Sequence, residues 1–567
     1  MTEFIKKYHW HIFIAIILLA AVLRFYDLSL VDLTTDDALY SFRALGWFDY
    51  LGSNAQTTPI QWFEQIPAWA NLSFHDGPPL AMAIQKIFFT LFGDNTFAAK
   101  IPFALAGVGL VVIIYLIIAE LRSKSAGLLG AGLAAIFSFN IWISRVGYLE
   151  GIEIFFISLA FYFFLKYLNT KKAYFLLFWA AALGLTLIVK YTSIYIIPAF
   201  ILYILIYDRK IFKLKEFYFS LGLILLIISP VAFYNLKVYQ TRSHFDAALS
   251  SIVGMHPQDF SIIAGRSLSH DYWNNFLSVA KILESITSWP LILIFLCSLI
   301  YLIWSLVKRR KLEVPENLII FGLFFLLVLF IFTGASLRFF PLINPFIIII
   351  ITIAAYDFLV SNAIKSSKIR GVAIILLIFI FGWEFLYSIN SNILASPINE
   401  NFLIYSSTAT SANLGFSQME KYLLKNVLPA NRQLIRPATL NQVYNRIDEY
   451  INTKHVVYFY DCSTSWFAYM WYEFRYPIYY GLPVICLDQM FQNNQKADPI
   501  TLLRSSGIRD FYFIYGVNRS VLDPVKADTD IRKLSESLSA ELEKNNIIPA
   551  EIKNRLGQTA FKVYHFN

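Results

Sequence analysis

The sequence is poor in charge and in cysteine. Only 15% of its 567 residues are charged, whereas soluble domains contain roughly 25%, and its three cysteines are too few to indicate a disulfide framework. Hydrophobic residues make up 57% of the chain and aromatic residues 17%. This composition excludes an ordinary soluble domain and predicts a polytopic α-helical membrane protein.

Other signals are missing too. No internal repeat or low-complexity segment is evident, and no cleavage site follows the first apolar run, Ile12 to Phe25, which is therefore predicted to remain as a membrane anchor. The net charge of +9 does not indicate a nucleic-acid partner, because the positive residues form short clusters between apolar runs. Such a distribution is a topology signal.

Eleven apolar runs are long enough to cross a bilayer, which takes ~17 to 25 residues. They lie at about 10–26, 101–120, 126–143, 149–167, 173–189, 191–207, 217–235, 288–307, 317–334, 340–360 and 371–390. A further run, Pro79 to Phe92, is shorter and ambiguous.

The positive clusters occupy five alternate loops, which are predicted to be cytoplasmic. Their residues are Arg122 and Lys124; Lys166, Lys171 and Lys172; Arg209, Lys210, Lys213 and Lys215; Lys308 to Lys311; and Lys365, Lys368 and Arg370. With a cytoplasmic N-terminus, the loops agree only if 79–92 does not cross. We therefore predict eleven crossings with an interfacial or half-inserted helix at 79–92, and an outer face formed by 27–100, 236–287 and everything after Asn390.

The tail, residues 391–567, is more polar than the membrane domain, residues 1–390. Its apolar runs at 455–460, 482–487 and 510–515 predict buried strands, and 417–425 and 528–544 predict helices. The tail is therefore expected to be a soluble α/β domain outside the cytoplasm. There Cys462 and Cys486 would be free to form one disulfide.

Two adjacent carboxylates, Asp36 and Asp37, follow the first apolar helix at the predicted membrane surface. One interpretation is that they cap the next helix, since acidic residues and threonines satisfy free N–H groups at helix starts. The other is catalysis, because a carboxylate beside a bound phosphate can take a proton from an incoming hydroxyl.

Four isolated cations fall at predicted outer ends of crossings, where topology does not require a positive charge. They are Lys100, Arg145, Lys190 and Arg338. Each alone is compatible with a snorkelling or interhelical role, but together they suit the phosphate of a lipid head group. Glu150 and Glu153 either orient Arg145 by pairing or cap their helix.

His75 precedes Pro78 and Pro79, which fix the start of the 79–92 helix. No second ligand stands at metal-site spacing from His75, so no metal site is predicted, and a structural or substrate-positioning role is expected. Tryptophans 47, 62 and 69 of the first loop either stack on sugar or belong to an interfacial belt.

The order of these features resembles the GT-C glycosyltransferases, across roughly residues 10–390. The features are the acidic pair, His-x-x-Pro-Pro-Leu at 75–80, Leu91-Phe92-Gly93 with a basic residue before Ile101-Pro102, Ser144-Arg145 with a following acid, Lys190 closing a helix, and Arg338-Phe339-Phe340-Pro341 with Pro345. The pattern is most similar to the branch that holds the dolichyl-phosphate-mannose–protein mannosyltransferases and the aminoarabinose transferase that modifies lipid A.

This resemblance implies a membrane enzyme that uses a polyprenyl-phosphate-linked sugar, with catalysis at the outer mouth and the catalytic acid on the first external loop, 27–100. Asp36 matches the leading Asp of the family, and Asp37 stands where many members have Glu. Lys100 replaces an Arg of the protein mannosyltransferases, which keeps a charge but loses the bidentate fork. The tail does not match the β-trefoil module of eukaryotic members.

The resulting hypothesis is an inverting transfer without a cofactor. Asp36 or Asp37 deprotonates the acceptor, while Lys100, Arg145, Lys190 and Arg338 hold the departing phosphate. Two alternatives stay open: a transporter or flippase of lipid-linked saccharide, which would be expected to carry ionisable or broken helices at the bilayer midplane, and a non-catalytic scaffold that presents the tail.

Overall fold

The structure is a computed structural model that describes residues 7–46, 65, 67–70, 77–258, 271–309, 315–360, 366–437, 439–488 and 508–567. The chain divides into two compact units. Unit 1 comprises Met1–Tyr26, Phe74–Ile84 and Lys100–Ser411, and unit 2 comprises Asp27–Ser73, Gln85–Ala99 and Ala412–Asn567. The predicted division at residue 390 places the first loop with the membrane domain, whereas the compact units group most of that loop with the tail.

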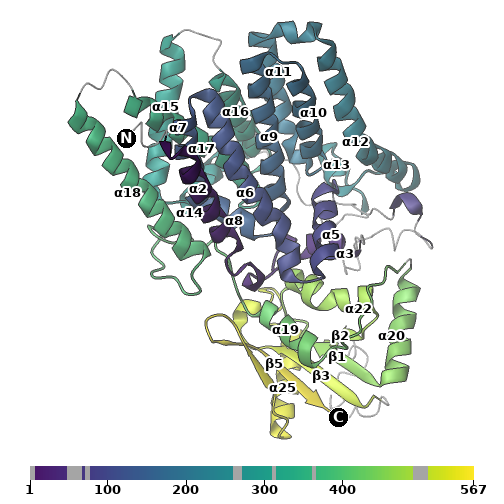
Figure 1. Ribbon diagram of the computed structural model, residues 1–567. Coiled ribbons are helices and arrows are strands. Elements are labelled where there is room, and N and C mark those ends of the chain that lie inside the picture. The colour runs from purple at the N-terminus through teal and green to yellow at the C-terminus, as the bar shows by residue number, and fades with distance from the viewer. Residues whose placement is uncertain are drawn as a thin grey trace. The chain divides into compact units, whose positions relative to one another are not determined.

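Unit 1 is a bundle of helices (Figure 1). Its α-helices are α2 (His9–Phe25), α6 (Thr96–Leu121), α7 (Lys124–Ile136), α8 (Ser138–Arg145), α9 (Leu149–Thr170), α10 (Tyr174–Leu187), α11 (Ile196–Tyr207), α12 (Lys215–Arg242), α13 (Ala247–Ile252), α14 (Tyr272–Ile286), α15 (Trp289–Arg309), α16 (Glu316–Thr333), α17 (Asn344–Val360) and α18 (Ser367–Asn392). Short 3₁₀ helices precede α11 (η3, Tyr191–Tyr195), α12 (η4, Arg209–Lys213) and α17 (η6, Phe340–Ile343). Helix α5 (Leu80–Phe92) begins in unit 1 and continues in unit 2.

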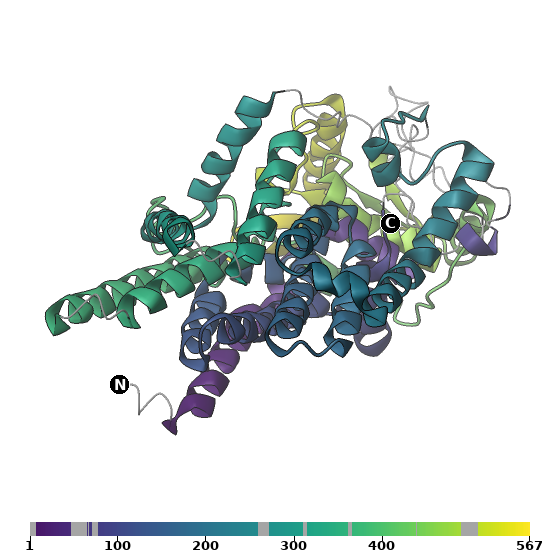
Figure 2. The same ribbon diagram turned by 90° about the horizontal axis from the view of Figure 1, so that it is seen from above.

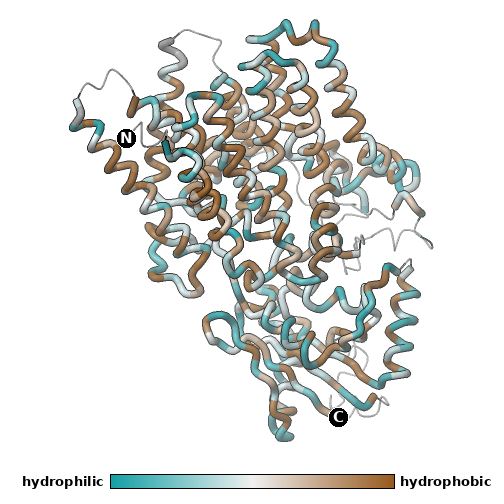
Figure 3. Tube along the Cα trace, viewed as in Figure 1, coloured by the Kyte–Doolittle hydropathy of each residue, from teal (hydrophilic) through white to brown (hydrophobic). Residues whose placement is uncertain are grey.

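The helices of unit 1 are apolar along most of their length, with hydrophilic residues at their ends (Figure 3). In the described part of the chain, seven helices are long and apolar enough to cross a membrane, and the pair α7 and α8, bent by 57° at a break, would make an eighth. Four more apolar helices are shorter: 80–92, 174–187, 191–207 and 289–305. The chain is therefore a polytopic α-helical membrane protein, as predicted, while the number of eleven crossings stays a prediction.

Ion pairs show which loops share one end of the bundle, called end A. Arg122 pairs with Glu316 and, at 2.7 Å, with Asp357, which joins the turn after α6 to the start of α16 and the last turn of α17. Lys171, after α9, pairs with Asp208, after α11, at 2.8 Å. The neighbouring pair Lys166 and Glu120 connects these two groups of loops. These loops belong to the predicted cytoplasmic side.

Contacts at the opposite end, called end B, involve the intervening loops. Lys190 and Arg338 both approach Glu150, and the amide of Leu80 donates to the carbonyl of Ile188 over 3.1 Å. Helices α10 and α11 therefore each connect end A with end B, although they are short. The bond to Ile188 places the first residue of α5 at end B, and the interpretation that 79–92 does not cross stays a prediction.

Neighbouring helices of unit 1 approach closely. Helix α10 packs against both α9 and α12, as the two views show (Figure 1, Figure 2). A Cβ on Gly107 of α6 would lie only 2.0 Å from the Ser144 hydroxyl oxygen and 2.9 Å from Arg24 Nε. Glycine at this position thus permits α6 to lie against two buried polar side chains.

Unit 2 contains a five-stranded sheet in the order β2-β1-β3-β5-β4. Strand β1 (Val456–Tyr460) pairs in parallel with β2 (Val484–Cys486) and β3 (Asp510–Gly516), and β5 (Thr559–Phe566) is antiparallel to β3 and β4 (Ala550–Lys553). Its helices are α3 (Asp36–Gly46), α19 (Phe416–Asn426), α20 (Leu440–Lys454), α21 (Trp466–Tyr469), α22 (Arg475–Tyr480) and α25 (Asp530–Lys544), with a π-helical turn, η7 (Met470–Phe474), between α21 and α22. The predicted α/β domain is confirmed.

The hydrophobic core of the sheet is formed by alternate strand residues and one helix. Phe459 of β1, Phe513 of β3 and Tyr564 of β5 are buried together with Leu538 and Leu542 of α25. The strands predicted at 455–460, 482–487 and 510–515 correspond to β1, β2 and β3, whereas β4, β5 and α20 were not predicted. Cys462 and Cys486 form a disulfide that ties the loop after β1 to the end of β2.

A buried carboxylate of the first loop is part of this domain. Asp32, which is 3% exposed, accepts hydrogen bonds from the backbone N–H groups of residues 414–417 at the start of α19, over 2.5 to 3.3 Å. Its own amide donates to Ala412. The first N–H groups of a helix lack partners within the helix. Asp32 therefore caps α19, although it lies 385 residues before Ser417 in the sequence.

Candidate active site

The acidic pair begins α3, and its two members are in different environments. Asp37 is buried, and its Oδ1 accepts from the Thr35 amide and hydroxyl, both at 3.0 Å, and from the Ala38 amide at 2.9 Å. Asp36 is only half-buried. The capping interpretation therefore describes Asp37 well, and Asp36 is the carboxylate that is more accessible to a substrate.

Lys190, Arg338 and Glu150 meet at end B of unit 1. The Lys190 ammonium donates to Glu150 Oε1, and Arg338 Nε lies 3.9 Å from the same oxygen. Both cations also lie over the ring of Phe339, at 4.2 and 4.7 Å from its centroid, a favourable cation–π geometry. Two basic groups thus share one carboxylate oxygen.

This cluster is buried but reaches the surface through its cations. Glu150 is fully buried, whereas the side chains of Lys190 and Arg338 keep 14% and 26% of their exposure. Burial lowers the pKa of Arg338 to about 10, so its guanidinium is still charged at neutral pH. Among the described residues, Glu150 Oε2 has no hydrogen-bond partner, so the cluster has an acceptor left for a ligand or water.

Side chains around Lys190 fix the backbone that carries it. Glu153, one turn after Glu150, accepts from Thr192 at 2.8 Å and from Ser193 at 2.6 Å. Tyr191 donates to Asp246 over 2.7 Å, and Asn235 donates to the same carboxylate oxygen over 2.7 Å. Glu153 therefore positions the 190–193 turn rather than Arg145, for which the sequence suggested it.

The proline turn lies against the same segment. The hydrogen bond from Leu80 to Ile188 places Pro78 and Pro79 next to the residues that precede Lys190. His75, Trp47 and Trp62 lie outside the described residues. Trp69 belongs to a short 3₁₀ helix of unit 2, η2 (Ala68–Ala70), and is partly buried.

Arg145 makes contacts of a structural kind. It is fully buried, and its guanidinium donates to the carbonyls of Leu23 at 3.2 Å and Tyr26 at 2.7 Å and to the Ser411 hydroxyl at 3.1 Å. It thereby ties the end of α8 to the last turn of α2. Its predicted phosphate role stays a prediction, and these contacts give it a structural role besides.

Lys100 is also fully buried, near the start of α6. Of the site residues predicted from the sequence, the structure brings Lys190, Arg338 and Glu150 into one cluster. Glu153 binds the turn that follows Lys190. Among the described residues, no group of three or more His, Cys, Asp or Glu side chains is placed to hold a metal ion.

Two buried ionisable residues of the spans were not singled out by the sequence analysis. Arg24 of α2 donates to the carbonyls of Ala134 and Ala135 at 3.1 Å. Glu384 of α18 accepts from the amides of Ser138 and Ser288, at 2.8 and 3.2 Å, where α8 and α15 begin. Their position inside apolar runs was the available signal, since charges there are costly and need partners.

Comparison with known proteins finds similarity in the sequence of one segment and in the fold of the chain. Residues 76–234 match the family described as dolichyl-phosphate-mannose-protein mannosyltransferase (PMT_2). This segment contains Lys100, Arg145, Glu150, Glu153 and Lys190. Two proteins of Bacillus subtilis (strain 168), named "Putative mannosyltransferase YycA" and "Putative mannosyltransferase YkcB", are 32% identical over 152 residues and 30% identical over 141 residues. These matches cover 27% and 25% of this chain and only 22% and 20% of the two relatives.

Solved structures match over nearly the whole chain. The crystal structure of ArnT from Cupriavidus metallidurans bound to undecaprenyl phosphate superposes with a TM-score of 0.51 at 13% identity, covering 98% of each chain. The oligosaccharyltransferase of Archaeoglobus fulgidus tethered to an acceptor peptide gives a TM-score of 0.50 at 13% identity, covering 99% of this chain and 74% of that one. The fold is therefore the one seen in ArnT, and the resemblance found in the sequence is confirmed.

Proposed function

We propose that this chain is a membrane glycosyltransferase that moves a sugar from a polyprenyl-phosphate-linked donor to an acceptor. The observation that carries the proposal is the cluster of Lys190, Arg338 and Glu150 beside the proline turn at end B. Lys190, Glu150 and the proline turn all lie within the segment that matches the mannosyltransferase family. The fold shared with ArnT, whose crystal contained undecaprenyl phosphate, supports the choice of donor.

Lys190 and Arg338 hold the phosphate of the donor in this proposal. A phosphate withdrawn from water is stabilised by charge-assisted hydrogen bonds, and the two cations present both an ammonium and a guanidinium from neighbouring loops. Glu150 keeps them oriented while the site is empty. Lys100, and Arg145 in addition to its structural contacts, are proposed to add positive charge at the same end.

Asp36 is proposed as the general base, with Asp37 fixing the start of α3. The acceptor hydroxyl gives its proton to the Asp36 carboxylate, and its oxygen bonds to the anomeric carbon from the side opposite the phosphate. The bond from that carbon to the phosphate oxygen breaks, and the electron pair leaves with the polyprenyl phosphate. One displacement of this kind inverts the anomeric configuration.

We infer that the reaction takes place on the outer face of the cell membrane. The basic clusters favour a cytoplasmic end A, which makes end B external. The disulfide in unit 2 supports the same orientation, since disulfides persist mainly in oxidising compartments.

The proposal is tested with the full chain in proteoliposomes and a panel of undecaprenyl-phosphate-linked sugars. Lys190→Gln and Arg338→Gln should each weaken donor binding by about tenfold, the effect of one charge-assisted hydrogen bond. Lys172→Gln, an exposed lysine at end A, is the matched control and should bind as the wild type does. Unchanged donor binding in both variants would contradict the phosphate assignment, and movement of intact donor across the membrane without sugar transfer would favour the transporter alternative.

A further inference from the structure

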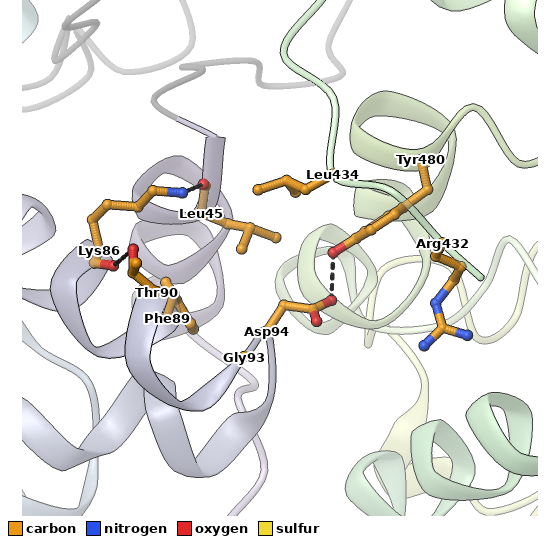
Figure 4. Close-up of a pocket in the computed structure, with 9 residues that line it drawn as sticks. All are labelled: Leu45, Lys86, Phe89, Thr90, Gly93, Asp94, Arg432, Leu434 and Tyr480. Atoms are coloured by element: carbon orange, nitrogen blue, oxygen red, sulfur yellow. Dashed lines mark hydrogen bonds between the residues drawn. The ribbon is translucent and has the colours of Figure 1, made fainter. Parts of the chain in front are cut away.

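Unit 2 contains a cavity that the proposed transfer does not use. Its volume is about 330 Å³, at the lower limit of pockets that hold small molecules, ≈ 300 Å³. It is lined by Leu45 of α3, by Lys86, Phe89 and Thr90 of α5, by Gly93 and Asp94 of the following turn, and by Arg432, Leu434 and Tyr480 (Figure 4). All of these residues belong to unit 2.

Basic groups stand on two sides of this cavity. Figure 4 shows Lys86 and Arg432 reaching its lining from different parts of the chain. The Lys86 ammonium donates to the Leu45 carbonyl in the last turn of α3, where the helix dipole favours a cation. Burial and the neighbouring charge of Arg436 lower the pKa of Lys86 to about 8, against the opposing charge of Asp94. Positive charge is therefore crowded here, which an anionic ligand would relieve.

A single carboxylate lies between these cations. Asp94 Oδ2 accepts from the Tyr480 hydroxyl at 2.6 Å and lies 3.9 Å from Arg475. Arg475 is fully buried and also pairs with Glu420. Among the described residues, Asp94 Oδ1 accepts no side-chain hydrogen bond, so the carboxylate is held rigidly by one oxygen with the other available to a donor.

The remaining walls are apolar. Leu45, Phe89 and Leu434 line the cavity between the charged groups, and Phe89 is fixed by stacking on Trp471 at 5.5 Å between ring centroids. A flat apolar ligand would not need the three charges, and a free anion would be repelled by Asp94. A ligand that fits all of the walls has an anionic group, hydroxyl donors and an apolar face.

We propose that this cavity binds an acidic saccharide, a sugar ring that bears a phosphate or carboxylate group. Lys86 and Arg432 attract the anionic substituent through their charge from the two sides of the cavity, Asp94 accepts from a ring hydroxyl, and the C–H face of the ring lies against Phe89 and Leu434. This site is separate from the donor cluster of unit 1, and it gives unit 2 a role in recognising glycans.

The experiment measures binding to the full chain in detergent micelles by ligand-observed NMR, with glucose 6-phosphate, glucose and inorganic phosphate as probes. Glucose 6-phosphate should bind more tightly than either of the other two. Lys86→Gln and Arg432→Gln should each weaken its binding by about tenfold, and Lys86→Arg should retain most of it. Lys421→Gln and Arg509→Gln, which remove exposed charges elsewhere in unit 2, should leave it unchanged.

Asp94→Asn tests the sugar part of the inference. It should lower the ratio of the affinities for glucose 6-phosphate and inorganic phosphate, because the anion contributes equally to both. A second measurement does not depend on variants: glucose 6-phosphate should protect the Lys86 amine from an amine-reactive reagent.

Three results would overturn the inference: inorganic phosphate binding as tightly as the sugar phosphate, glucose 6-phosphate binding that does not respond to Lys86→Gln and Arg432→Gln, and absence of both binding and protection. Since no lipid-linked donor is present, such a result would leave the proposed transfer untouched.

Discussion

Lys190 and Glu150, forty residues apart in the chain, form a largely buried ion pair at end B of the bundle. Arg338 shares the same carboxylate oxygen from a third segment. A pair of this kind is a weak source of stability, because the desolvation of both charges offsets most of their attraction. Its position beside the proline turn therefore favours a functional reason for keeping two cations and one carboxylate at this place.

Separate changes to this pair should distinguish stability from function. Glu150→Gln leaves Lys190 and Arg338 without their shared carboxylate, so the free energy of unfolding should fall by about 3 kcal/mol, as when one partner of a buried pair is removed. The double variant Glu150→Leu, Lys190→Met should recover most of that loss but should not bind the donor. Denaturant unfolding and donor titration measure the two effects, and donor binding by the double variant would exclude a role for Lys190 in the site.

The two aspartates of α3 should respond differently to amidation. Asp36→Asn should lower the transfer rate by about 10² to 10⁴, the usual contribution of a general base, with little change in melting temperature. Asp37→Asn should mainly cost about 1 kcal/mol through its cap hydrogen bonds. Initial rates and thermal melting of both variants are the measurements. The opposite pattern, a stable but inactive Asp37→Asn and an active Asp36→Asn, would move the base to Asp37.

Lys86 should make the free energy of unfolding change with pH in the alkaline range. Its pKa is about 8 in the folded protein and about 10.4 in an unfolded chain, so the unfolded state binds more protons between these values. The unfolding free energy contributed by Lys86 should therefore rise as the pH increases from about 8 to about 10. Denaturant unfolding across this range, compared with Lys86→Gln, isolates the effect. A difference between the two proteins that stays constant with pH would contradict it.

Loss of the disulfide should destabilise unit 2 specifically. Cys462 and Cys486 are 24 residues apart. Closing a loop of this size lowers the conformational entropy of the unfolded chain, which raises the free energy of unfolding by about 3 kcal/mol. The double variant Cys462→Ser, Cys486→Ser should show this loss for the unfolding of unit 2, with the helical signal of unit 1 retained. Cys297→Ser is the matched control because Cys297 is a free, exposed cysteine of unit 1. Equal melting of all three proteins would show that the bond adds no stability.

Much of the fold was accessible from the sequence because it follows local rules. Each of the eleven apolar runs corresponds to helix, and three predicted strands were found at their places in unit 2. The short strand β4 and the helix α20 were missed, since β4 carries no apolar run of its own and α20 has a polar exposed face. Their placement is decided by pairing with β5 and packing against β1.

The candidate site was less accessible. Sequence order shows that Lys190, Arg338, Glu150 and Arg145 lie near helix ends, but it does not show which of them meet. Arg145 donates to carbonyls at the end of α2. These carbonyls need a donor because they lie at a helix end, and the pattern of side chains in the sequence does not show which residue supplies it. The Lys86 cavity was missed entirely, because its lining comes from four separate segments of the chain.

The cap that Asp32 provides for α19 has a consequence for the biosynthesis of the protein. The carboxylate emerges early, but its four hydrogen-bond donors lie 382 to 385 residues later. At about 5 to 20 residues per second, a ribosome needs roughly 20 to 80 s to reach them. Throughout that interval the polypeptide carrying Asp36 and Asp37 lacks its final support, so the acidic pair reaches its mature geometry only near the end of translation, and a chain truncated before residue 414 never acquires it.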